Sequence, residues 1–231
     1  MPSLDAVRAR FARNEGLPFA DILTEASIRD VLNEHAVQYR DRVFSPVTTI
    51  WGFLGQVLSE DHSCRDAVSR IIAHRAANGM TVCSPNTASY CTARSRVPTR
   101  VLSVLTKRTA EELQASAGDL WKWNGRSVFI VDGSHVSMPD TAENQAEYPQ
   151  PPTQLAGVGF PLARITVVLS LATGACHDLA IAPYKGKGTG EKTLFRRMYD
   201  TLNAGDVVLA DALFDDYFIA CELCNRGVDL V

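Results

Sequence analysis

Two short apolar runs that each end on an aspartate constrain the fold of this chain most strongly. Residues 128–131 (Val-Phe-Ile-Val) lead into Asp132, and residues 207–210 (Val-Val-Leu-Ala) lead into Asp211. Continuous aliphatic runs of this length are typical of strands that are buried on both faces of a sheet. The sequence therefore predicts two inner strands, each with a carboxylate at its end.

These two aspartates are candidate metal ligands and candidate catalytic groups. An ionised carboxylate is costly inside a sheet, so each is expected to meet water, a partner charge or a metal. Mg²⁺ (or Mn²⁺) binds through a few carboxylates, water and substrate phosphates, and two such ions roughly 3.5–4 Å apart serve phosphodiester exchange. The alternative is that Asp132 and Asp211 only cap the turns that follow their strands.

The elements after residue 118 predict a mixed α/β domain. Apolar patterns indicate strands at 128–132, 164–172, 176–182 and 207–211, a further strand starting near 227, and helices at 194–202 and 215–225. Three antiparallel strands followed by alternating helices and strands give a mixed sheet with helices on its faces. This is the element order of an RNase H-like fold, which carries acids on its first and fourth strands.

The first 118 residues predict a helical region. Ser45-Pro46 is a good N-cap and first-turn pair, a second helix is expected from about Ser63, and Gly118 is a plausible stop. The expected domains are therefore 1–118, helical and DNA-binding, and 119–231, RNase H-like.

The charge of the chain is unevenly distributed, although its net charge is only −3. Between residues 65 and 108 there are eight basic residues and one acid, a local charge of +7. Such an excess is expected of a surface that binds phosphates, here double-stranded DNA. The alternative is a solvated helical face. The candidate DNA-binding residues in this segment are Arg94, Arg96, Arg100, Lys107 and Arg108.

Residues 186–193 (Gly-Lys-Gly-Thr-Gly-Glu-Lys-Thr) nearly match a phosphate-binding P-loop, but Glu191 stands where the second glycine should be. We therefore expect a flexible basic loop in which Lys185 and Lys187 contact the DNA backbone. Glu191 opens the following helix, where a glutamate is favourable with the helix dipole. In ribonucleases H a glutamate from this helix joins the metal site, so Glu191 is also a candidate ligand.

No apolar run approaches the roughly 20 residues needed to cross a bilayer, and residues 1–5 do not resemble a signal peptide. We therefore expect a cytoplasmic protein with no membrane partner. The six scattered cysteines indicate free thiols rather than a disulfide framework.

Several short motifs between about residues 45 and 231 resemble, in order, the DDE transposases of the insertion-sequence-4 group. They are Val131-Asp132-Gly133-Ser134, residues 136–141, 144–145, 148–150 and 157–161, Arg164, residues 171–174 and 190–191, and Gly205 to Asp211. The resemblance implies Mg²⁺-dependent cleavage and strand transfer at the terminal inverted repeats of a bacterial insertion sequence. It also implies target DNA as a partner, self-association, and a place near the bacterial nucleoid.

The chain departs from that pattern in two places. Ala212 stands where the family often has arginine, and neither Glu222 nor Asp229 matches the family's third acid. The resemblance therefore implies a chain truncated before the third acid and inactive alone. The rival hypotheses are a non-catalytic DNA-binding fragment and a P-loop-like nucleotide-binding protein.

Overall fold

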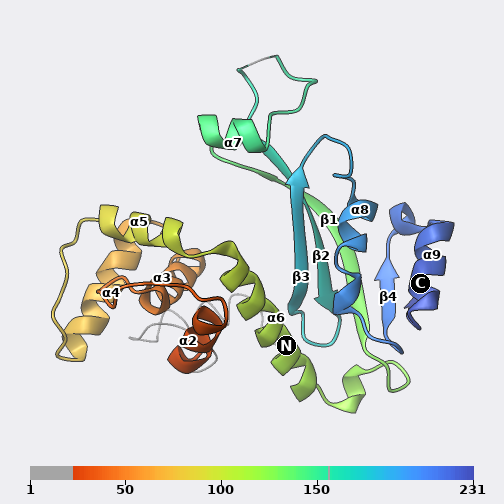
Figure 1. Ribbon diagram of the computed structural model, residues 1–231, viewed down its shortest axis with the longest axis horizontal. Coiled ribbons are helices and arrows are strands. Elements are labelled where there is room, and N and C mark those ends of the chain that lie inside the picture. Colours follow the sequence, from red (N-terminus) through yellow and green to blue (C-terminus); the bar gives the residue numbers. More distant parts are fainter. Residues whose placement is uncertain (1–22, 156) are drawn as a thin grey trace. The chain divides into compact units, whose positions relative to one another are not determined.

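A computed structural model describes residues 23–155 and 157–231, and the chain divides into two compact units (Figure 1). Unit 1 comprises Met1–Leu105 and unit 2 comprises Thr106–Val231. The division falls inside helix α6 (Thr99–Ser116), whereas the sequence suggested a boundary just after that helix, at Gly118. The functional division into a DNA-binding and a catalytic domain stays a prediction.

The described part of unit 1 is helical, and side-chain caps set where its helices begin. Ser45 accepts a hydrogen bond from the Thr48 amide at 3.4 Å, and Ser63 accepts one from the Asp66 amide at 3.1 Å. Both helix starts expected from the sequence are confirmed. The helices are α2 (Glu25–Glu34), α3 (Pro46–Leu58), α4 (Cys64–Ala77), α5 (Ala88–Arg96) and the first part of α6.

Two apolar clusters stabilise unit 1. One joins α2, α3 and α6, and the other joins α4 and α5 around the fully buried Tyr90. The Tyr90 hydroxyl donates to Gln56 Oε1 at 2.9 Å, and burial raises the pKa of Tyr90 to about 12. Gly52 allows α3 and α4 to approach, because a Cβ atom there would lie 2.8 Å from Ile71 Cδ1.

Unit 2 is a five-stranded mixed sheet with the order β3-β2-β1-β4-β5. The pairs β1–β2 and β2–β3 are antiparallel, whereas β1–β4 and β4–β5 are parallel. The predicted strands and helices occur in the expected order, but the structure has an additional short helix, α7, between β1 and β2, which the sequence did not predict. The fold class is mixed α/β. The elements of unit 2 after α6 are η1 (Asp119–Trp121), β1 (Val128–Ser137), α7 (Ala142–Glu147), β2 (Leu162–Ser170), β3 (Cys176–Pro183), α8 (Glu191–Arg196), η2 (Tyr199–Thr201), β4 (Val207–Ala210), η3 (Ala212–Phe214), α9 (Tyr217–Asn225) and β5 (Asp229–Leu230).

The core of unit 2 covers one face of the sheet. Val131 of β1, Val168 of β2 and Val208 of β4 pack there with side chains from α8, η2 and α9. Leu179 and Ile181 of β3 are 49% and 42% exposed, so their parts of the sheet surface are incompletely covered. The core face is therefore the face that carries Val131, and this distinction decides where the candidate site residues lie.

Two elements differ from their predicted lengths. Strand β1 continues to Ser137 instead of ending at Asp132, because residues 133–137 pair with β2 along their whole length. The expected helix over 194–202 is split into α8 and η2, with i→i+3 hydrogen bonds such as Met198 N to Phe195 O at 2.9 Å. Its apolar positions are nevertheless buried as the spacing predicted.

Among the described residues, no helix has the length and apolarity that crossing a membrane would require. All six cysteines are free thiols, as expected from their scatter.

Candidate functional site

The two aspartates follow in-register partners on adjacent parallel strands. Val131 of β1 pairs with Ala210 of β4, and Asp132 and Asp211 are the next residues along each strand. Because the strands are parallel, both carboxylates lie at the same edge of the β1–β4 pair. The two predicted strands that end on aspartates are therefore neighbours in the sheet. The parallel pairing ends there, although β1 itself continues beside β2.

The same register places both aspartates on one face of the sheet. Val131 and Ala210 both pack against the core of unit 2, and side chains alternate between faces along a strand. Asp211 keeps an extended backbone (φ −76°, ψ 173°), so the alternation reaches it. Asp132 and Asp211 therefore share the face opposite the core, and both residues are exposed.

Each carboxylate uses one oxygen in a local hydrogen bond. Asp132 Oδ1 accepts from the Gly133 amide at 2.8 Å, and Asp211 Oδ1 accepts from the Leu213 amide at 2.9 Å as the N-cap of η3. The turn-capping role is therefore real for Asp211. Among the described residues the second oxygen of each carboxylate has no hydrogen-bond partner, which leaves it available to a ligand.

Glu191, the first residue of α8, lies over Gly133. A Cβ atom at Gly133 would overlap the Glu191 carboxylate and lie 2.7 Å from its Cγ atom. Gly133 alternates onto the face of Val131, so Glu191 approaches β1 from the core face, opposite to Asp132. Glu191 thus lies against the residue that follows Asp132, but on the opposite face of the strand, and its role as a metal ligand stays a prediction.

Arg164 of β2 holds Glu191 in this position. Its Nε atom lies 3.7 Å from Glu191 Oε1, and its Nη1 atom donates to the Thr189 carbonyl at 3.1 Å. His135 of β1, the partner of Arg164 in the sheet, approaches Arg164 Nε with its Nε2 atom at 3.4 Å. The Tyr184 ring lies 5.2 Å from the guanidinium carbon. We call His135, Arg164, Tyr184, Thr189 and Glu191 the Arg164 cluster.

Most residues of the Arg164 cluster were not predicted from the sequence to belong to a functional site. His135 lies on β1, beyond the predicted end of that strand, and the centres of the His135 and Tyr184 rings are 4.9 Å apart. Arg164 was recognised only as part of a motif. The available signal was a lone arginine at the beginning of an apolar strand.

Asp132 and Asp211 are the residues of the candidate site that could bind a metal ion. Among the described residues no group of three His, Cys, Asp or Glu side chains converges at metal-binding distance. Two carboxylates on one face, each with an oxygen that makes no protein hydrogen bond, match the hard oxygen ligands that Mg²⁺ and Mn²⁺ prefer. Metal binding by Asp132 and Asp211 stays a prediction.

The predicted basic residues of unit 1 have different surroundings. Arg94 is turned inward, since its Nη1 atom donates to Gln56 Oε1 at 3.2 Å and its guanidinium lies 4.9 Å from the centre of the Phe53 ring. Arg100 is exposed and donates to the His35 carbonyl at 3.1 Å. Arg96 is exposed at the end of α5. The residue best placed for a DNA contact is Arg96.

The remaining basic candidates belong to unit 2. Lys107 forms an ion pair with Asp178 Oδ2 at 2.7 Å, which joins α6 to β3. Lys185 and Lys187 are exposed in the loop between β3 and α8. Arg108, on α6, is half-buried. DNA binding by these four residues stays a prediction, and the loop lysines are the most accessible.

Comparison with known proteins gives one distant relative. The chain is 25% identical, over 136 residues, to an Escherichia coli (strain K12) protein described as "Putative transposase InsZ". The match covers 58% of this chain and 44% of that protein, so the chain spans less than half of its relative's length. No protein-family model and no solved structure matches the chain. The similarity supports a relationship to a transposase.

Proposed function

We propose that this chain is part of a metal-dependent DNA transposase in which Asp132 and Asp211 are metal ligands. The observation that carries the proposal is the placement of both carboxylates on one face, directly after in-register residues of adjacent parallel strands. The sheet order and the distant transposase relative support it. An RNase H-like catalytic domain of the insertion-sequence-4 group, acting near the nucleoid, is the finer form of this proposal.

The chemistry that the site would perform is cleavage and transfer of DNA phosphodiesters. Bound Mg²⁺ or Mn²⁺ would supply positive charge to a phosphodiester and to its attacking oxygen. The chain contributes two carboxylates whose separation is fixed by backbone pairing of β1 with β4. It also contributes exposed lysines, Lys185 and Lys187, which are suited to binding DNA phosphates.

Iron-directed cleavage tests the metal site without requiring enzymatic activity. Fe²⁺ replaces Mg²⁺ at carboxylate sites, and with ascorbate and peroxide it cuts the backbone next to the bound ion. We expect cuts near Asp132 and Asp211 that excess Mg²⁺ suppresses. The variant Asp132→Asn should weaken this cleavage by about tenfold or more, because one charged ligand is lost.

Asp215→Asn is the matched control for that experiment. Asp215 is an exposed aspartate just beyond η3, outside the strand-end pair. Its replacement removes the same charge and should leave the cleavage pattern unchanged. Cleavage that is absent from the wild-type chain, or equal in both variants, would contradict the proposal.

A second candidate function is DNA binding without catalysis. The hydrogen bonds from the Gly133 and Leu213 amides favour it, because they give each aspartate a structural use. In that case Fe²⁺ would produce no localised cuts, while the chain would still bind duplex DNA.

A further inference from the structure

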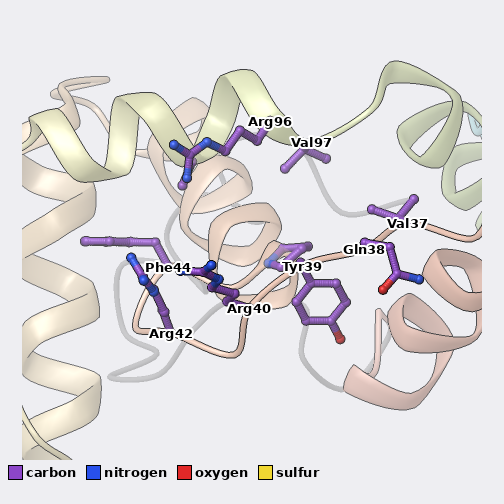
Figure 2. A pocket seen from close by; sticks show the side chains of 10 residues that line it. Val37, Gln38, Tyr39, Arg40, Arg42, Phe44, Arg96 and Val97 are labelled. Atoms are coloured by element: carbon purple, nitrogen blue, oxygen red, sulfur yellow. The ribbon is translucent and has the colours of Figure 1, made fainter.

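Unit 1 contains a hollow of about 660 Å³ with arginines on its walls (Figure 2). Arg40 and Arg42 come from the segment between α2 and α3, and Arg96 comes from the last turn of α5. All three arginines are exposed. The described residues that line the hollow include no carboxylate, so its positive charge is not balanced from within.

Two other arginines of the same unit are paired with carboxylates. Arg29 forms an ion pair with Glu25 at 2.6 Å, and Arg70 forms one with Asp66 at 2.7 Å. None of the ion pairs between described residues involves Arg40, Arg42 or Arg96. Like charges around one hollow repel each other, and a bound anion would relieve that repulsion. The arrangement therefore favours an anionic ligand.

The walls between the arginines are held by the core of the unit. Phe44 packs against the buried Tyr90 ring, with the ring centres 5.9 Å apart. The Tyr39 hydroxyl accepts a hydrogen bond from Arg29 Nη1 at 2.9 Å. These contacts fix the segment that carries Arg40 and Arg42, so two of the three charges are presented by an anchored backbone.

A second hollow of about 500 Å³ adjoins the first, since Arg42, Phe44, Ala93 and Arg96 line both. Together the two hollows form an extended basic groove. Such a groove suits a polyanion better than a single small anion. Arginine is also the residue best suited to phosphate, because its planar fork donates two parallel hydrogen bonds.

We propose that this groove binds phosphate groups of a DNA strand through Arg40, Arg42 and Arg96. The proposal rests on the DNA-binding function proposed above and names the surface responsible in unit 1. It adds Arg40 and Arg42, which lie outside the basic segment that the sequence indicated. It assigns no DNA contact to Arg94, which packs against other side chains within unit 1.

Salt-dependent binding of a fluorescein-labelled DNA duplex to the whole chain tests the groove. Each lost phosphate contact should reduce the slope of log K against log salt by about 0.9. We expect that reduction for Arg42→Ala and about twice that reduction for the double variant Arg42→Ala/Arg96→Ala. The control is Arg65→Ala, which removes one charge from an exposed arginine on α4 outside the groove and should leave the slope unchanged.

Protection from phenylglyoxal, which modifies exposed guanidinium groups, provides a readout that does not depend on variants. Duplex DNA should protect Arg40, Arg42 and Arg96, but not Arg65, as measured by mass spectrometry of peptides. Protection by inorganic phosphate or a mononucleotide, but not by DNA, would overturn the assignment of DNA as the ligand.

Two failures can be told apart. If the wild-type chain binds DNA but Arg42→Ala and Arg65→Ala behave alike, the groove proposal is wrong and the DNA-binding function stands. If the wild-type chain binds no duplex at any salt concentration, the proposed function itself fails.

Discussion

Gly133 has no room for a side chain, because the Glu191 carboxylate occupies the space above its Cα atom. Because the Glu191 carboxylate is the far end of a flexible side chain and can move, we expect Gly133→Ala to lower the free energy of unfolding by about 0.5–1.5 kcal/mol, the usual cost of a strained rotamer. Urea unfolding followed by circular dichroism measures this. Gly118→Ala is the control, since Gly118 has φ −67° and no atom within 4 Å of a Cβ.

The double variant Gly133→Ala/Glu191→Ala isolates the contact. Removing the Glu191 side chain should restore most of the stability lost in Gly133→Ala, with a coupling of about 0.5–1.5 kcal/mol. Additive losses from the two single changes would show that the glycine is needed for another reason.

At the level of residues, the sequence predicted the aspartate pair but not its surroundings. Asp132 and Asp211 could be found because a run of apolar residues before an acid is a local pattern. The contact between Arg164 and Glu191 depends on how β2 and α8 meet in space, and no local pattern encodes it. The same holds for Arg94, whose partners on α3 and α4 make it an internal residue.

Strand β3 carries a buried histidine that should make the free energy of unfolding of unit 2 depend on pH. His177 is 5% exposed and stacks edge-on against Phe129 of β1. Burial lowers the pKa of His177, against a smaller opposing effect of the Glu111 carboxylate. The folded state therefore binds a proton less readily than the unfolded state, in which the pKa is about 6.5.

The free energy of unfolding should consequently decrease as the pH falls through about 6.5. His177→Phe keeps a ring against Phe129 but cannot be protonated, so we expect it to flatten this dependence. Urea unfolding of both chains between about pH 5 and 8 provides the measurement. A variant that keeps the wild-type slope would assign the pH dependence to other groups.

Elements that begin at a capping side chain were predicted well, and elements defined by their partners were not. Ser45 and Ser63 cap helices that begin where expected. The extension of β1 through His135 could not be predicted, because polar residues become a strand there only by pairing with β2. The segment of Arg40 and Arg42 has no periodic pattern, so nothing in the sequence placed these residues beside Arg96.

At the scale of the whole molecule, each unit has its own apolar core. Ile71 is fully buried in a cluster of unit 1, and Phe195 is fully buried in the core of unit 2. Ile71→Ala should cost about 2–5 kcal/mol and Phe195→Ala about 3–5 kcal/mol. Because the clusters share no residue, we expect each loss to be confined to its own unit.

Hydrogen exchange resolved by peptide measures this confinement. Ile71→Ala should accelerate amide exchange in residues 23–105, and Phe195→Ala should accelerate it in the sheet and helices of unit 2. Faster exchange throughout the described chain in either variant would instead indicate a single cooperative unit.

The close approach of Glu191 to Gly133 also restricts how related chains can diverge. The two positions belong to different elements, yet they share one volume, so they should vary together. A relative with a side chain at the position of Gly133 should carry a residue shorter than glutamate at the position of Glu191. Covariation of this pair in an alignment of related sequences would be independent evidence that α8 packs on β1.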